Sequence, residues 1–137
     1  MGCKCDNCGG GIVGLAHIGI RVRDMEVSKK FYIDALGFEL TDECQMGATK
    51  LAFLNIGDCK IELIQPADYA ERVPGQIDHI AVEVTEIEPL VCRLIEKGVR
   101  FDTDQISDAP GLLGGVRNIF FSGPDGERIE FFEYLNR

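Results

Sequence analysis

The chain has no long hydrophobic run and no excess of basic residues, and these two absences exclude broad classes of protein. No stretch approaches the roughly 20 consecutive apolar residues that a membrane-spanning helix needs, so we expect no membrane partner. Lysine and arginine number 14 against 23 acidic residues, a formal net charge of −9. A nucleic-acid surface needs a basic stripe along the phosphates, so we expect no nucleic-acid partner. The few basic residues can instead mark a local anion pocket.

The first residues also lack the apolar segment of a signal peptide, which predicts a cytoplasmic protein. In that compartment the six cysteines are expected as reduced thiols rather than as a disulfide framework. Cys3, Cys5 and Cys8 cluster before three glycines and could take a soft metal if a fourth ligand arrived from elsewhere. Because no histidine lies near them, we interpret residues 1–14 as a flexible Cys/Gly-rich tail.

What the chain does contain is an internal repeat. The sequence HIGIRVRDME that starts at His17 returns as HIAVEVTEIE at His79, and KIELI around Glu62 returns as RIEFF around Glu130. His17 and His79 are the only histidines of the chain. A repeat exposes the architectural unit, so we predict two equivalent halves, each with one His and one Glu as ligands for a metal ion.

Each half is expected to form a strand, a helix and three further strands. In the first half, residues 15–66, alternation predicts a strand over 15–23, and helical spacing predicts a helix over 26–36 that starts after Asp24 and stops at Gly37. Residues 67–76 are the expected linker, and residues 77–137 form the second half. The remaining strands are predicted at 38–40, 50–55, 60–65, 78–85, 100–102, 116–122 and 128–134, the second helix at 87–97, and an irregular loop at 107–115.

The duplicated βαβββ pattern, with H-x-G-x-x-V-x-D near its start and I-E-L or I-E-F near its end, resembles the vicinal oxygen chelate superfamily. That family includes glyoxalase I, or lactoylglutathione lyase, and methylmalonyl-CoA epimerase. The resemblance covers residues 15–134 and includes the Pro-Asp-Gly turn at 124–126. It implies an α+β fold in which two βαβββ units form a metal-binding cleft, and it implies a homodimer. The implied metal ligands are His17, Glu62, His79 and Glu130.

Two imidazoles and two carboxylates suit one divalent metal, Ni²⁺ or Zn²⁺ first, with Co²⁺, Mn²⁺ or Fe²⁺ as alternatives. A metal that holds two substrate oxygens stabilises the enediolate formed when a neighbouring carbon loses its proton. By resemblance to glyoxalase I, Glu130 is the base and Glu62 its partner. The substrate is then the hemithioacetal of methylglyoxal and a thiol, and the product is an S-2-hydroxyacyl thiol.

Substrate binding is expected to involve Arg21, which matches an arginine that holds a glutathione carboxylate in glyoxalase I. A rim arginine paired with an acidic residue is the alternative. Pro66 stands near the place where relatives carry a substrate-binding asparagine, so the substrate is left open as a thiol adduct or a thioester. The aromatic residues do not decide it, because those at strand positions are expected mainly in the core: Phe53, Phe120, Phe121, Phe131 and Phe132.

Other functions remain open. Methylmalonyl-CoA epimerase is the first alternative, because residues 57–66 and 96–100 look like stretches common in that group, and Glu43 could supply the additional base that Gln45 cannot. A dioxygenase or a fosfomycin thiol transferase would use only His17, His79 and Glu130, and the glutamate at position 62 argues against both. A metal-free drug-binding module has the same fold, but the complete ligand set argues against it.

Overall fold

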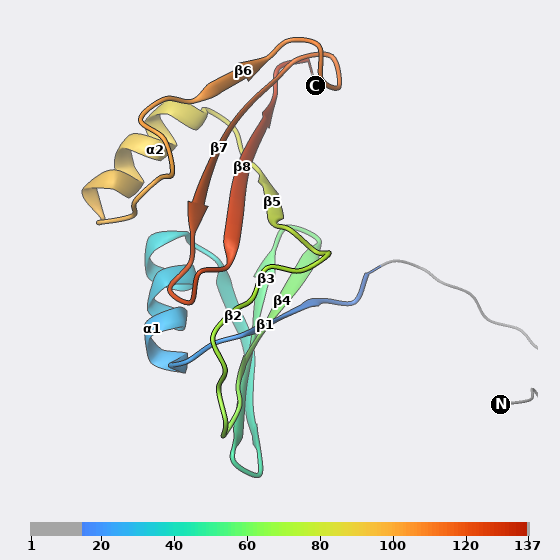
Figure 1. Cartoon of the computed structure of the whole chain (residues 1–137), viewed down its shortest axis with the longest axis vertical. Helices are drawn as coiled ribbons and strands as arrows, with labels where there is room; N and C mark the ends of the chain where they lie inside the picture. The colour runs from blue at the N-terminus through green and yellow to red at the C-terminus, as the bar shows by residue number, and fades with distance from the viewer. Residues whose placement is uncertain (1–14, 137) are drawn as a thin grey trace, which may run out of the picture.

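The structure is a computed structural model that describes residues 15–136, so the predicted cluster of Cys3, Cys5 and Cys8 lies outside the described residues. The chain forms two units with the same order of elements, each with a four-stranded mixed sheet (Figure 1). The first unit contains β1 (Ile18–Arg21), α1 (Met25–Lys29), the π-helix η1 (Lys30–Ala35), β2 (Glu39–Met46), β3 (Thr49–Ile56) and β4 (Cys59–Gln65). The second contains β5 (Ile80–Glu83), α2 (Ile87–Glu96), β6 (Ser107–Ala109), β7 (Val116–Ser122) and β8 (Arg128–Tyr134).

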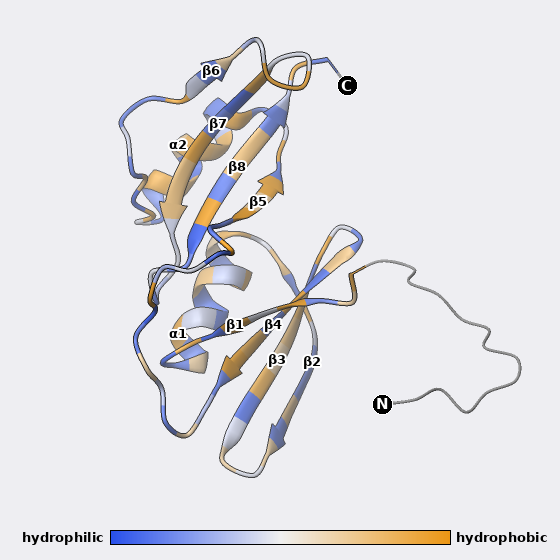
Figure 2. Ribbon diagram, turned by 45° about the vertical axis from the view of Figure 1, so that its right-hand side comes forward, coloured by the Kyte–Doolittle hydropathy of each residue, from blue (hydrophilic) through white to orange (hydrophobic). Residues whose placement is uncertain are grey.

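The two sheets repeat one topology, with strand orders β1-β4-β3-β2 and β5-β8-β7-β6. In each sheet the first strand of the unit pairs in parallel with the last, and the remaining neighbours pair antiparallel. The predicted α+β fold of two βαβββ units is therefore confirmed. In Figure 2 hydrophobic and hydrophilic residues alternate along β8, as expected for a strand with one face in the core.

The first helix starts and stops where the sequence predicts. The Asp24 side chain accepts hydrogen bonds from the amides of Glu26 and Val27, which caps the helix N-terminus. Gly37 has a φ of +80°, the left-handed conformation that ends many helices and that glycine adopts most readily. The second half of this helix is a π-helix rather than an α-helix, a feature that the periodicity did not indicate.

The strand predicted at 100–102 does not form. The loop predicted at 107–115 is also wrong in part, because its first three residues form a strand. Phe101 makes only an isolated bridge to Phe121. The edge strand is instead β6, in which Ala109 pairs with Val116 of β7. The turn between them contains Gly114 and Gly115, both with positive φ, and it folds the chain back on itself. A three-residue strand is too short to give a clear alternation in sequence.

One hydrophobic core joins the two units. It contains Leu54 and Leu63 of the first sheet, Phe121 and Phe131 of the second, and Tyr32 of η1, all almost completely buried. The core placement expected for Phe121 and Phe131 is confirmed. In contrast, three of the phenylalanines expected in the core are only half-buried: Phe53, Phe120 and Phe132. Among residues 15–136, no helix is long and apolar enough to cross a membrane.

Candidate metal centre

The first candidate ligand pair forms where β1 and β4 run in parallel. His17 lies just before β1, and Gly19 of β1 pairs with Glu62 of β4. Because side chains alternate along a strand, His17 and Glu62 reach the same face of the sheet. His17 Nε2 lies 2.7 Å from Glu62 Oε2. Phe53 of β3, the residue opposite Glu62, makes a T-shaped contact with the imidazole, with ring centroids 5.8 Å apart.

The second unit builds the same arrangement at matching positions. Ala81 of β5 pairs with Glu130 of β8, and His79 Nε2 lies 3.0 Å from Glu130 Oε2. Phe120 of β7 lies opposite Glu130 and makes the same T-shaped contact with the imidazole of His79, at a centroid distance of 5.2 Å. The sequence repeat is therefore also a repeat in space, down to the aromatic ring that packs against each histidine.

The second pair has two further partners. Asp78 Oδ2 lies 2.7 Å from His79 Nδ1 and also accepts a hydrogen bond from Arg128. These contacts, with His79 first, lower the pKa of Asp78. The Asn118 side-chain amide donates to Glu130 Oε1 at 2.7 Å. A carboxylate on the far nitrogen of a histidine is the outer-shell arrangement that fixes metal-bound imidazoles, because it leaves Nε2 free to coordinate.

The donor chemistry of both pairs fits a divalent transition metal. In each pair an imidazole nitrogen and a carboxylate oxygen converge, and these are the donors that Zn²⁺, Ni²⁺ and related ions accept. Within residues 15–136, however, no group of three or more His, Cys, Asp or Glu side chains lies close enough together to hold a metal ion. Within its described residues, the chain thus presents the four predicted ligands as two separate half-sites.

Arg21, the predicted substrate-binding residue, lies close to the second half-site. It lines a cavity of about 360 Å³ that His79, Arg72 and Arg128 also line. Arg21 is exposed and makes no side-chain hydrogen bond or ion pair with another residue of 15–136. Whether it binds substrate or pairs with an acidic residue stays a prediction.

Sequence reasoning missed the residues that support the ligands. Asp78 and Asn118 have no counterpart in the first unit, where Ala16 and Leu51 occupy the matching positions. A search for repeated residues therefore overlooks them. Phe53 and Phe120 do repeat, and each pairs across the hairpin with the glutamate of its own unit. That shared position opposite a glutamate was the signal that could have separated them from the core phenylalanines.

Comparison with known proteins gives the class to which this fold and site belong. The sequence model of the Glyoxalase/Bleomycin resistance protein/Dioxygenase superfamily matches residues 14–131. The chain therefore belongs to this superfamily, the vicinal oxygen chelate family.

Individual relatives and structures fit that assignment. The chain is 36% identical to the uncharacterized protein YwbC of Bacillus subtilis over 124 residues, which cover 85% of this chain and 94% of YwbC. It is 27% identical to the mitochondrial methylmalonyl-CoA epimerase of Mus musculus over 101 residues, 66% of this chain and 57% of the epimerase. The fosfomycin resistance protein FosX of Listeria monocytogenes, solved with Mn(II) and sulfate, superposes with a TM-score of 0.70 at 21% identity, over 92% of this chain and 96% of FosX. Members of the superfamily thus include proteins that bind a divalent metal.

Proposed function

We propose that this chain is a metal-dependent enzyme that moves a proton on a carbon next to a carbonyl group, as glyoxalase I does. The observation that carries the proposal is the duplicated half-site, His17 with Glu62 and His79 with Glu130. One imidazole and one carboxylate are too few ligands for a tight site, whereas two such pairs give the four protein ligands of a stable one.

Two protomers can supply both pairs. In a dimer with two-fold symmetry, a contact between the first unit of one chain and the second unit of its partner occurs twice. Each contact then joins His17 and Glu62 of one protomer to the second half-site of the other, and the dimer holds two equal sites. This arrangement accounts for the separation of the half-sites within one protomer.

A bound Ni²⁺ or Zn²⁺ ion would supply positive charge beside two substrate oxygens. The residues of the chain do the remaining work. Glu130 accepts the proton from the substrate carbon and returns it to the adjacent carbon, with Glu62 as its partner. The hydrogen bond from Asn118 holds the Glu130 carboxylate in one direction, which keeps Oε2 facing the site. Arg21 binds a carboxylate of the substrate thiol through its guanidinium. Methylglyoxal hemithioacetals fit these roles.

The first experiment measures metal content and activity together. The full chain is purified without chelator, analysed for bound metal, reconstituted with Ni²⁺ or Zn²⁺, and assayed with methylglyoxal and glutathione. We expect one ion per chain, and loss of activity in Glu130→Gln with the ion retained in part. A chain that binds no metal in any of these conditions would refute the proposal.

A mixing experiment tests whether the sites are shared. His17→Ala and His79→Ala are expected to be inactive alone. When the two variants are unfolded together and refolded, half of the dimers carry one variant of each kind, and such a dimer has one intact site because His17 and His79 of that site come from different chains. Activity should return to about a quarter of the wild-type value. Sites built within single chains would give no recovery.

Epimerisation of an acyl-CoA thioester is the second candidate, favoured by the similarity to methylmalonyl-CoA epimerase. It uses the same proton abstraction but needs a base on each side of the carbon. The two half-sites offer Glu62 and Glu130 for these roles. Glu43, the other residue considered for this role, accepts a hydrogen bond from the Lys29 ammonium group. Incorporation of solvent deuterium into methylmalonyl-CoA, without any turnover of methylglyoxal, would favour this candidate over the first.

A further inference from the structure

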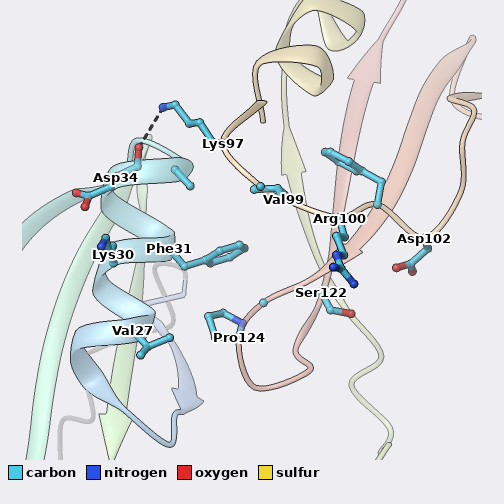
Figure 3. A pocket seen from close by; sticks show the side chains of 14 residues that line it. Val27, Lys30, Phe31, Asp34, Lys97, Val99, Arg100, Asp102, Ser122 and Pro124 are labelled. Atoms are coloured by element: carbon cyan, nitrogen blue, oxygen red, sulfur yellow. Dashed lines mark hydrogen bonds between the residues drawn. The ribbon is translucent and has the colours of Figure 1, made fainter. Parts of the chain in front are cut away.

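A second cavity lies between the two units, and none of the four candidate metal ligands lines it. Its volume is about 890 Å³, within the range of small-molecule sites. The first unit contributes one wall through α1 and η1. The second unit contributes the other wall through the segment after α2 and the hairpin between β7 and β8 (Figure 3). We call this space the inter-unit cavity.

One wall of the inter-unit cavity is apolar. Val27 and Phe31 project from the helix in Figure 3, and Pro124 of the hairpin lies beside Val27 and below Phe31. The ring of Phe31 packs on Phe121 of the core, which fixes its position. Val27 is 52% exposed although it is a large aliphatic residue. An aliphatic side chain that remains accessible beside an aromatic ring gives a surface on which an apolar group can be buried.

The opposite side of the cavity carries an unpaired cation. Arg100 lies there beside Ser122, across from Phe31 (Figure 3). Within residues 15–136, neither the Arg100 guanidinium nor the Ser122 hydroxyl makes a hydrogen bond or an ion pair, so both donors are free. In contrast, Arg23, Arg117 and Arg128 each bind a carboxylate, at 3.1, 2.6 and 2.8 Å. The Arg100 guanidinium is thus available to an anionic group that enters the cavity.

The cavity as a whole has more cations than carboxylates along its lining. Lys30 and Lys97 also line it, and Lys97 Nζ donates to the backbone carbonyl of Asp34 rather than to a carboxylate. The acidic residues on the lining are Asp34 and Asp102, and neither forms an ion pair with a described residue. The lining therefore carries three cations and two carboxylates, with Lys30 and Asp34 on the helix and Arg100 and Asp102 on the opposite side (Figure 3).

We propose that the inter-unit cavity binds a small organic acid with an apolar body. The body packs against Val27, Phe31 and Pro124, and the acid group binds the Arg100 guanidinium and the Ser122 hydroxyl. Guanidinium groups recognise carboxylate or sulfonate groups through two parallel hydrogen bonds. Because both units line the cavity, a bound acid touches both of them and stabilises their packing, in proportion to its occupancy.

The probe is 8-anilinonaphthalene-1-sulfonate, an aromatic acid whose fluorescence rises on binding. Its uncharged analogue N-phenyl-1-naphthylamine has nearly the same apolar body. We expect saturable binding of the acid to the folded full chain, displacement by decanoate but not by decanol, and a higher melting temperature when decanoate is present. Arg100→Gln should weaken binding of the acid about tenfold or more, the effect of losing a charge-assisted pair. It should leave binding of the uncharged analogue unchanged.

Two variants control the experiment. Arg93→Gln removes the same charge from an exposed position of α2 outside the cavity and should leave both affinities unchanged. Val27→Asp places a carboxylate on the apolar wall and should weaken binding of both compounds. Equal binding of acid and analogue, equal effects of Arg100→Gln and Arg93→Gln, or no saturable binding would overturn the proposal. So would a dimer that Val27→Asp dissociates while the acid fails to bind, because the cavity would then be an interface between two copies.

Discussion

The two half-sites carry the same ligands but differ in how firmly they are held. The first His–Glu pair is the more open, with side-chain exposures of 42% for His17 and 15% for Glu62. The second pair is 32% and 7% exposed. Within residues 15–136 the first pair has no further hydrogen-bond partners, whereas Asp78 and Asn118 support the second. The two copies of the repeat thus keep the donor atoms and differ in the residues around them.

In the proposed reaction, this difference would give the two copies different tasks. A carboxylate held by a second hydrogen bond loses rotational freedom, so Glu130 presents one oxygen in a defined direction. Such a group suits a base that must return a proton to a specific carbon. Glu62, with His17 as its one described side-chain partner, can adjust its position as a ligand enters. Substitutions that exchange residues between the copies test this interpretation.

The largest effect is expected when either half-site loses its imidazole. His79→Ala and His17→Ala each remove one nitrogen ligand, and metal affinity should fall by more than about 100-fold, beyond the range of changes made outside the ligand set. Competition with a coloured chelator measures the affinity. A variant that keeps wild-type affinity would show that its histidine is not a ligand.

Asn118→Leu places in the second copy the residue that the first copy has at position 51. Glu130 loses its hydrogen bond, and we expect metal affinity or kcat to fall by about 10- to 100-fold. The reciprocal variant Leu51→Asn adds an amide near Glu62 and should not lower either quantity. Equal behaviour of the two variants would remove the distinction between the half-sites.

Asp78→Ala places an alanine before His79, as Ala16 stands before His17 in the first copy. His79 loses the acceptor for Nδ1 that sets its tautomer, and metal affinity should fall by about tenfold, the lower end of outer-shell effects. Asp104→Ala removes a carboxylate from an exposed loop and serves as the matched control. The free energy of unfolding should change little in either variant, since Asp78 is exposed. A drop in affinity shared by both variants would point to net charge instead.

The smallest effect concerns Glu127, a buried residue that stands where the first copy has Cys59. Burial raises its pKa, a hydrogen bond from the Asp125 amide partly offsets that rise, and the charge of Asp125 adds to it. A carboxyl whose pKa is higher in the folded state binds its proton more tightly there, so its contribution to stability falls as the pH rises above the unfolded-state pKa. At pH 7 the Glu127→Gln variant should therefore have a free energy of unfolding about 1 kcal/mol higher than the wild type, and it should unfold at a higher urea concentration.

The control for Glu127→Gln is the pH dependence of the difference in unfolding free energy between the variant and the wild type. Near pH 4 the advantage of Glu127→Gln over the wild type should shrink, because the native carboxyl is then largely protonated. The buried Tyr32 hydroxyl, whose pKa is raised by burial and by Glu127, stays neutral across this range. Urea unfolding at several pH values measures the difference. A constant difference at every pH would contradict the assignment.

The sequence predicts the repeated parts of this molecule well and the unrepeated parts poorly. The strand β7, the strand β8 and the cap at Asp24 lie where alternation and capping residues place them. The His–Glu pairs follow from the same logic, because equal positions in equal units fold to equal places. Asp78 and Asn118 could not be predicted this way, since their role depends on which side chains lie across the strands. The separation of the half-sites depends on how the two units pack, which no local pattern encodes.

The π-helix η1 also records how the two copies diverged in length. Gly37 follows His17 by 20 positions, whereas Gly98 follows His79 by 19. A π-helical turn closes its hydrogen bond across one more residue than an α-helical turn. The wide turn therefore accommodates one additional residue between a fixed histidine and a fixed helix end. The extra residue, which would otherwise rotate Gly37 and the following strand out of register, is absorbed inside the helix, so one wide turn of backbone lets two copies of unequal length build the same sheet.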